Sequence, residues 1–86
     1  MDLSVVVPTL NAVGRLASTL DVLVERAPDA EVIVVNGPSA DGTSGMVRDH
    51  DGVDLLLELS ERNLNTSRNA GIAEASGDVI ALVGQD

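Results

Sequence analysis

The sequence contains no cysteine, no lysine and no aromatic residue, and each absence removes a class of function. Without cysteine there are no disulfides, thiol nucleophiles, zinc–thiolate sites or iron–sulfur clusters. Without lysine there is neither Schiff-base chemistry nor the phosphate-binding lysine of a P-loop. Without aromatic rings there is no aromatic platform on which a base can stack, which argues against the usual single-strand nucleic-acid modules.

The charge of the chain is strongly one-sided. Fourteen acidic residues face five arginines, which gives a formal net charge of −9 over 86 residues. Such a chain repels polyphosphate backbones and anionic lipid, so we expect no nucleic-acid partner. The acid-rich, lysine-free composition resembles that of proteins from extreme halophiles, whose surfaces stay hydrated in concentrated salt. The alternative is an acidic mesophilic protein from a GC-rich genome.

The length suits a single small domain, residues 1–86, because domains usually span roughly 50–200 residues. Hydrophobic residues make up 44% of the chain, which is enough to build a core. No apolar run approaches the roughly 20 residues of a membrane span, and Met1-Asp2-Leu3 lacks the basic start of a signal peptide. We therefore expect a cytoplasmic protein without a membrane segment.

Four short apolar runs are spaced along the chain. They are continuous rather than alternating, which is typical of strands covered on both faces. The first run is closed by Pro8, and the last is closed by a glycine. The four predicted strands cover residues 3–7, 31–35, 53–57 and 78–83.

Helical patterns separate the predicted strands. From Val13 to Ala27 the apolar residues recur at the spacing of one helix face. A short second helix is expected after Asp41, which can cap its first amides, and a third over residues 66–76. We expect Gly77 to end the third helix in a left-handed conformation.

Strands alternating with helices predict an α/β fold of three layers, with a parallel sheet and right-handed βαβ crossovers. We expect the strand order 3-2-1-4, numbered along the chain, as in one half of a doubly wound fold. The winding then reverses between the first and fourth strands. Ligands bind beyond the carboxyl ends of the strands at such a reversal. Three segments should line this crevice, namely residues 8–11, 36–41 and 84–86.

The crevice segments carry polar groups but no dinucleotide fingerprint. Residues 8–14 read P-T-L-N-A-V-G, which matches neither G-x-G-x-x-G nor a Walker A loop. The carboxylates of Asp41 and Asp86 suit Mg²⁺ or Mn²⁺ when substrate phosphates complete the coordination shell. Arg62 and Arg68 lie in or beside the loop before the third helix and can pair with phosphate. This combination favours a nucleotide-diphosphate ligand.

Four blocks, in order along the chain, carry a family resemblance. They read S-V-V-V-P-T-L-N (residues 4–11), V-I-V-V-N-G-P-S-A-D-G-T (32–43), S-R-N-A-G-I-A-E-A-S-G-D-V-I-A (67–81) and L-V-G-Q-D (82–86). The first looks like the opening of family 2 glycosyltransferases of the GT-A fold, and the second resembles their V-V-D-D-G-S-T-D-G-T block. The third closely matches their A-R-N-x-G-I-x-x-A-x-G-D-x-I-x block, and the fourth falls where their D-x-D metal motif stands. The chain thus resembles the N-terminal, nucleotide-sugar-binding half of such an enzyme.

The resemblance implies a truncated, Rossmann-like GT-A domain that serves sugar transfer from a nucleotide-diphosphate sugar to an acceptor. It also implies a divalent metal, Mn²⁺ or Mg²⁺, that Asp86 holds against the diphosphate, where the metal stabilises the departing group as a Lewis acid. The nucleotide-binding residues implied in this sequence are Pro8, Thr9, Asn11, Gly37, Arg62 and Arg68.

The sequence departs from the family pattern at two acids and nominates no catalytic base. The second acid of the second block, which contacts the base in the family, is Gly37 here, and the first acid of D-x-D is Gly84. The family's acceptor-binding half and general base fall beyond the last matched block, and an inverting transfer needs that base.

Two hypotheses therefore stay open. The chain is either a donor-binding portion that acts only with further chain or a separate C-terminal half, or a catalytically dead remnant. Such a remnant is either a binding or interaction module or a truncated gene product with no retained activity. We further expect the fourth strand to form an exposed edge that allows a homodimer.

Overall fold

The computed structural model describes residues 2–9, 13–37, 42–60 and 63–83 of the chain. Strands and helices alternate along it without exception. The elements are β1 Leu3–Thr9, α1 Val13–Arg26, β2 Glu31–Asn36, α2 Thr43–Asp49, β3 Leu55–Glu58, α3 Leu64–Glu74 and β4 Val79–Leu82.

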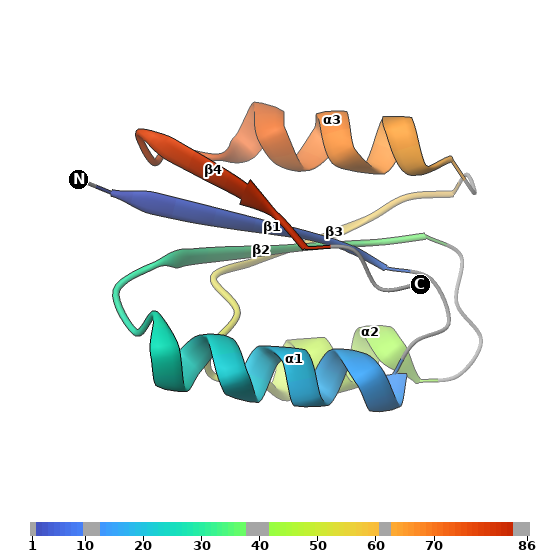
Figure 1. Ribbon diagram of the computed structural model, residues 1–86. Coiled ribbons are helices and arrows are strands. Elements are labelled where there is room, and N and C mark those ends of the chain that lie inside the picture. Colours follow the sequence, from blue (N-terminus) through green and yellow to red (C-terminus); the bar gives the residue numbers. More distant parts are fainter. Residues whose placement is uncertain (1, 10–12, 38–41, 61–62, 84–86) are drawn as a thin grey trace.

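The four strands form one parallel sheet in the order β3-β2-β1-β4. Helices α1 and α2 lie on one face of this sheet and α3 lies on the other (Figure 1). The predicted three-layer α/β fold and the strand order 3-2-1-4 are confirmed. Within the described residues, no helix is long and apolar enough to cross a membrane.

The two central strands, β1 and β2, divide the core between the two faces of the sheet. Their side chains alternate, so neighbouring residues enter opposite halves of the core. The half of the core between the sheet and helices α1 and α2 contains the buried side chains of Val5, Val7, Leu16, Leu20, Val32, Val34 and Val47. The half between the sheet and α3 contains Val6, Ile33 and Val35. Both faces are covered, which explains why these strands read as unbroken apolar runs.

Strand β1 continues through Pro8 to Thr9, so the prediction that Pro8 closes this strand is wrong. The amide of Val83 donates to the carbonyl of Val6. The N–H and C=O groups of the even-numbered residues of β1 therefore point toward β4. The missing N–H of Pro8 therefore lies on the β4 side, two residues past Val6, whose pair with Leu82 is the last between β1 and β4. No ladder hydrogen bond is lost there, and the strand tolerates the proline.

Helix α3 packs directly on β1 and β2 because Gly71 faces them. A Cβ at Gly71 would overlap Cγ1 of Val6 and lie 3.1 Å from Cγ2 of Val35. Ala70 and Ala75 also pack against this half of the core, whereas Ala73 is exposed. The helix and sheet approach closely because the residues between them are small.

The ends of α3 differ from the prediction. The helix begins two residues earlier, at Leu64, where Asn63 caps it by accepting a hydrogen bond from the amide of Thr66 (3.1 Å). It ends at Glu74, and the next residue is already extended. Among the described glycines only Gly42 has a positive φ, so Gly77 is not a left-handed terminator. Gly77 is instead required by space, because a Cβ there would lie 2.7 Å from the Ser4 hydroxyl.

A hydrogen-bonded cluster joins three elements at the amino ends of the strands. Glu31 of β2 accepts hydrogen bonds from the Ser4 hydroxyl (2.8 Å), the Ser76 amide (2.9 Å) and the Ser76 hydroxyl (3.0 Å). The Ser4 hydroxyl also accepts from the amide of Gly77 (2.8 Å). The Ser76 amide first, and then the two hydroxyls, hold the pKa of Glu31 below its usual value of 4.5. The cluster fixes the turn that leads from α3 into β4.

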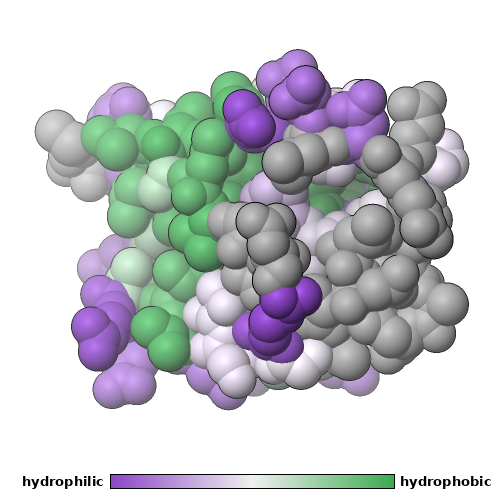
Figure 2. All heavy atoms as spheres, turned by 45° about the vertical axis from the view of Figure 1, so that its right-hand side comes forward, coloured by the Kyte–Doolittle hydropathy of each residue, from purple (hydrophilic) through white to green (hydrophobic). Residues whose placement is uncertain are grey.

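Strand β4 forms an edge of the sheet, because it pairs only with β1 in the part of the chain that the structure describes. Its apolar side chains are well exposed, with 42% of Val79, 39% of Ile80 and 47% of Leu82 accessible. Figure 2 shows an apolar band on this side of the molecule, between polar surfaces above and below it. The expected exposed fourth strand is confirmed for the described residues.

We expect Gly71→Ala to destabilise the protein by about 1–3 kcal/mol, because the added methyl group overpacks the α3–sheet contact. The control is Gly45→Ala, at a helical position with open space around it. That change should stabilise the protein by about 0.5–1 kcal/mol, the ordinary helix preference of alanine over glycine. Urea unfolding of both variants measures the free energies. Equal effects of the two substitutions would contradict the close contact at Gly71.

We expect the free energy of unfolding to fall with acid in a way that depends on Glu31. The folded-state pKa of Glu31 lies below 4.5, so the cluster stabilises the protein above that pH. This contribution is lost as the pH falls through the folded-state pKa. The stability difference between the wild type and Glu31→Gln should therefore be largest near pH 7 and shrink below pH 4.5. Urea unfolding from pH 7 to pH 3 tests this, with Glu25→Gln on the exposed surface of α1 as the control.

Candidate functional site

The carboxyl ends of β1 and β2 bring two polar residues together. Thr9 and Asn36 are in register as the last residues of the two strands. The amide of Gly37 donates to the carbonyl of Thr9 (2.9 Å), which ties the chain to β1 as it leaves β2. The described starts of α1, α2 and α3 all lie at this end of the sheet (Figure 1). This is the place where the sequence predicts a ligand crevice.

Asn36 is a buried, neutral group at the end of β2. It is 1% exposed, and its amide donates to the Ser44 hydroxyl in the first turn of α2 (2.8 Å). Thr43, beside Ser44, is also fully buried. In the family pattern of the second block, the position of Asn36 holds the first of two acids. Here an amide at that position donates the hydrogen bond to α2. A carboxylate has no N–H to donate and would be costly to bury at this position.

Thr9 carries the buried hydroxyl that most needs a partner. The residue is only 6% exposed, and its Oγ1 has no hydrogen-bond partner among the described residues. Leaving such a hydroxyl unsatisfied costs about 1–3 kcal/mol. Thr9 and Asn36 both continue the side-chain series that faces α1 and α2. A ligand group at this edge could therefore satisfy the hydroxyl.

Only some of the other residues predicted to bind the nucleotide or metal lie within the described part of the chain. Pro8 is buried in β1 and shapes the strand rather than offering a polar side chain. Arg68 lies in the second turn of α3, partly exposed, and pairs with no acid among the described residues. Asn11, Arg62 and Asp86 lie outside the described residues. The structure thus brings Thr9 and Gly37 together, and it records no contact between them and Arg68.

The start of α2 departs from its predicted cap. The N-cap residue is Gly42, in a left-handed conformation with φ of 84°, and no side chain caps the helix there. The predicted cap, Asp41, lies outside the described residues. Glycine is the residue that adopts this conformation without strain.

The described residues alone do not form a metal site. No group of three histidine, aspartate or glutamate side chains gathers among them. The carboxylate at the end of β3, Glu58, is paired with Arg48 on α2 (2.6 Å). The polar atoms at this edge are neutral oxygens of Thr9, Asn36 and Ser44. The metal prediction therefore depends on Asp86.

Sequence reasoning did not single out two residues that build this edge. The sequence places Asn36 in a predicted crevice segment and Ser44 at the start of a predicted helix. It assigns neither residue a role of its own. The available signal was the unusual asparagine at the end of an otherwise apolar strand, because a buried polar residue in such a run must find a hydrogen-bond partner.

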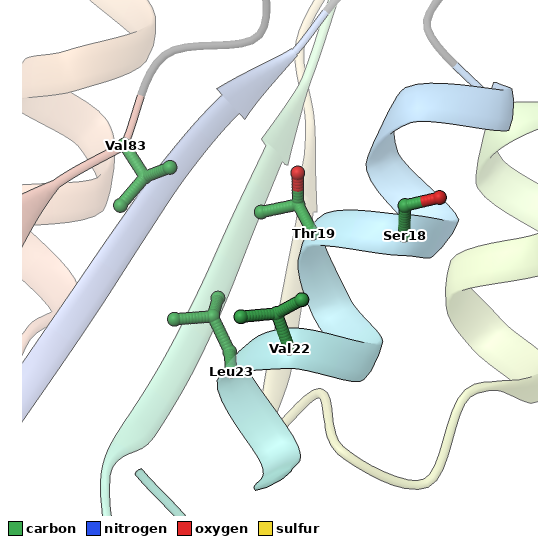
Figure 3. Close-up of a pocket in the computed structure, with 5 residues that line it drawn as sticks. All are labelled: Ser18, Thr19, Val22, Leu23 and Val83. Carbon is green, nitrogen blue, oxygen red and sulfur yellow. The ribbon is translucent and has the colours of Figure 1, made fainter. Parts of the chain in front are cut away.

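A hollow lies between α1 and β4, and its lining includes neither Thr9 nor Asn36. It is an open groove of about 320 Å³ lined by Ser18, Thr19, Val22, Leu23 and Val83 (Figure 3). Val83 points toward α1, and Val22 and Leu23 point from α1 toward the sheet. The lining is mostly apolar and contains no titratable group, so the groove does not resemble a nucleotide site.

Comparison with known proteins identifies relatives over nearly the whole chain. The glycosyl transferase family 2 model matches residues 4–86. Glycosyltransferase AglE of Haloferax volcanii is 29% identical, and the amylovoran biosynthesis glycosyltransferase AmsB of Erwinia amylovora is 37% identical. Each alignment covers 96% of this chain but only 30% of the relative.

Solved structures agree with the sequence comparison. The mannosyltransferase PcManGT of Pyrobaculum calidifontis, in complex with GDP-Man and Mn²⁺, matches with a TM-score of 0.85 and 29% identity. The match covers 98% of this chain and 27% of that protein. TarS of S. aureus matches with a TM-score of 0.83 and 28% identity, over 100% of this chain and 17% of TarS. The described fold is thus the fold of part of these larger glycosyltransferases.

The family match includes both parts of the polar edge, the end of β1 with Thr9 and the end of β2 with Asn36 and Gly37. It also includes the α3 segment with Gly71 that packs on both strands. With the family model matching all but three residues, the chain belongs to glycosyl transferase family 2.

Proposed function

We propose that this chain is the donor-binding portion of a sugar transferase, which binds a nucleotide-diphosphate sugar at the carboxyl ends of β1 and β2. The observation that carries the proposal is the buried Thr9 hydroxyl, which has no partner among the described residues and lies beside Asn36 and Gly37. This position adjoins the reversal of winding between β1 and β4, where doubly wound folds bind ligands. The mannosyltransferase PcManGT supports the ligand class, since its structure is described in complex with GDP-Man and Mn²⁺.

In this proposal the nucleoside contacts neutral groups. Thr9 donates or accepts one hydrogen bond, and Gly37 leaves open the space that an acid fills in the family pattern. Pro8 holds the end of β1 in place, and Asn11 adds an amide from the following segment. Arg62 and Arg68 face the diphosphate, because a guanidinium pairs well with phosphate.

The metal part of the proposal follows from charge. A nucleotide-diphosphate sugar is an anion, and this chain carries a net charge of −9, so their general attraction is unfavourable. A divalent cation, Mn²⁺ or Mg²⁺, would be held by Asp86 and the donor's phosphates. When bound there, it supplies Lewis-acid stabilisation to the leaving diphosphate.

We propose that the chain alone binds donor without transferring sugar. Transfer to an acceptor hydroxyl needs a base, and the sequence offers no candidate for that role. The relatives are much longer, and this chain spans 30% of the two curated relatives described above. Further chain or a separate acceptor-binding half would complete the reaction. The expected cytoplasmic location stays a prediction.

A second candidate function is an inactive family member that has lost donor binding. The observation that favours it is the loss of acids from the family pattern, at Asn36, Gly37 and Gly84. Direct binding measurements distinguish the two candidates.

We expect saturable binding of at least one of UDP, GDP or their sugars in Mn²⁺, measured by titration calorimetry in molar KCl. Thr9→Val should weaken binding about tenfold, the effect of one lost hydrogen bond, while the protein stays folded. Thr19→Val, the same change in the middle of α1, should leave the affinity unchanged. Asp86→Ala should remove the dependence on Mn²⁺, whereas Asp29→Ala, an exposed acid elsewhere, should not. No binding by the folded protein would favour the inactive candidate.

We propose that the protein is adapted to high salt, because repulsion among its acids opposes compaction and salt screens it. The free energy of unfolding should rise between about 0.1 M and 2 M KCl. Neutralising the exposed acids in Asp49→Asn/Asp51→Asn should raise stability at low salt and flatten the salt dependence. Urea unfolding measures both effects. The proposal of salt adaptation is wrong if the wild-type stability stays constant across this range.

A further inference from the structure

We propose that Asn36 is a deamidation site, at which the backbone nitrogen of Gly37 attacks the side chain of Asn36 when the carboxyl end of β2 opens. The native fold holds this reaction back, so its rate reports how often that end of the strand opens. The proposal concerns a chemical change of the chain itself and does not depend on donor binding.

Asn36 is followed by the residue that makes this reaction easiest. The chain contains five asparagines, and only Asn36 precedes a glycine. In an open chain, the attacking backbone nitrogen must approach the side-chain carbon of the asparagine before it. A glycine has no Cβ to obstruct this approach and adopts a wide range of backbone conformations. The other asparagines precede alanine, leucine or threonine, so the sequence singles out Asn36.

The reaction takes up one water molecule and releases one ammonia. The Gly37 nitrogen forms a bond to Cγ of Asn36, the bond between Cγ and Nδ2 breaks, and the Gly37 proton leaves with Nδ2 as ammonia. The product of this step is a cyclic succinimide. Water then opens the ring at either of its two carbonyl groups, which leaves aspartate or isoaspartate at position 36. Solvent water is the only co-reactant.

Both reacting nitrogens are held by hydrogen bonds in the native structure. The N–H of Gly37 donates to the carbonyl of Thr9 (2.9 Å). The Nδ2 group of Asn36 donates to the Ser44 hydroxyl (2.8 Å). The first hydrogen bond directs the nucleophile toward β1, and the second directs the side chain toward α2. The two groups are thus held by different neighbours.

The backbone at Asn36 is fixed from both sides of the strand. Asn36 is in register with Thr9 of β1 and with Glu58 of β3. Its carbonyl accepts a hydrogen bond from the amide of Leu59 (2.9 Å). Ring closure needs rotation about the bonds of Asn36, which these contacts oppose. Asn36 is also only 1% exposed and Gly37 is buried, so solvent water has little access to the reacting groups.

Deamidation of the native chain must therefore pass through an opened state. Proteins open locally with free energies that range up to that of global unfolding. A domain of this size is only marginally stable, so its opened state is populated at a measurable level. The rate of deamidation is then the open fraction multiplied by the rate in the unfolded chain. Opening is reversible but the loss of ammonia is not, so modified chains accumulate with time.

An aspartate at position 36 would disturb the polar edge through its charge. A carboxylate has no N–H to donate to Ser44 and is costly to bury. Its register neighbour would be Glu58, which is already paired with Arg48 of α2. Neighbouring strands lie about 4.8 Å apart, and like charges at paired positions repel. The net charge would change from −9 to −10, because one neutral amide becomes a carboxylate.

Isoaspartate would disturb the same edge through its geometry. In this product the main chain runs through the side-chain carbon, which lengthens the backbone at the end of β2. The register of Asn36 with Thr9 and the hydrogen bond from Gly37 to Thr9 both depend on the normal spacing. Both products therefore weaken the end of the sheet where the Thr9 hydroxyl is buried. Asn36 is thus a point at which this protein ages irreversibly.

The first test follows deamidation by mass spectrometry of tryptic peptides. The chain has no lysine, so trypsin cuts only after arginine, and residues 27–48 form one peptide in which Asn36 is the only asparagine. In urea at mildly alkaline pH, this peptide should be modified faster than the peptides that contain the other asparagines. In molar KCl without urea, it should react at least about a hundredfold more slowly than in urea. A zero-time sample corrects for reaction during digestion.

The control for the chemistry is Gly37→Ala, compared with the wild type in urea, where the fold has no influence. The reaction at residue 36 should slow to the rate of Asn11 and Asn69, which also precede alanine. Because this comparison is made on unfolded chains, it does not require Gly37→Ala to fold.

The second test changes the open fraction without changing the Asn–Gly pair. Gly71→Ala overpacks the contact with Val35, the residue before Asn36, and should speed native deamidation about fivefold or more. Gly45→Ala, in α2 beside Ser44, should slow it about twofold to fivefold. In urea, both variants should react at the wild-type rate.

The third test measures what the modification does to the protein. Asn36→Asp should lower the urea concentration at which the chain unfolds. Asn69→Asp makes the same change at an exposed position on α3 and should leave that concentration nearly unchanged. An Asn36→Asp variant that is unfolded even without urea would show the expected weakening in its extreme form.

The proposal is overturned if the peptide 27–48 is modified equally fast with and without urea, because the native contacts would then offer no protection. It is also overturned if this peptide reacts no faster in urea than the other asparagine peptides. Native rates that are the same in Gly71→Ala, Gly45→Ala and the wild type would exclude a reaction through opening. An Asn36→Asp variant as stable as the wild type would overturn the conclusion that the reaction weakens the sheet.

Discussion

The contact between Gly71 of α3 and Val6 of β1 determines the spacing of the whole molecule. The chain has no aromatic side chain with which to fill a wide gap between layers, so the layers must approach closely. A glycine in the middle of α3 permits this approach, and Val6 occupies the space that a Cβ would take. Because α3 is held against β1 and β2 in this way, its first turns reach the carboxyl ends of the same strands. The packing of a small-residue helix thus places the start of α3 at the same end of the sheet as the carboxyl ends of β1 and β2 (Figure 1).

The side chains of Thr9 and Asn36 at the carboxyl ends of β1 and β2 are buried and uncharged, although the protein is strongly acidic. Thr9, Asn36 and Ser44 offer hydroxyl and amide groups, and the carboxylate at the end of β3 is already paired with Arg48. Neutral hydrogen-bonding groups are less affected by salt than charged ones, because screening acts on charges. In the proposed function, this edge would bind the uncharged parts of a nucleotide in concentrated salt. The phosphates then depend on the arginines and a cation, which are the components that salt weakens.

The fold was predictable from the sequence because its signals are local and repeated. Continuous apolar runs predict buried parallel strands, and the strand order then follows from short, right-handed crossovers. The errors occurred where tertiary contacts override local preference. Pro8 stays in a strand because its missing N–H lies past the end of β4. Gly77 was expected to terminate a helix, yet it is needed because the Ser4 hydroxyl occupies the adjacent space. Neither contact can be read from neighbouring residues.

The site was less predictable than the fold for a related reason. A motif can place Thr9 at the end of a strand, but only the packed structure shows that its hydroxyl is buried without a partner among the described residues. The edge strand β4 presents the opposite case. Its apolar sequence predicts a neighbouring strand on each side, and the described residues supply one. Residues 79–83 have the composition of a strand with neighbours on both sides, and the described chain supplies only β1. A strand beside β4 would pair with the backbone of this strand and cover its exposed apolar side chains at the same time, so one contact would meet both needs.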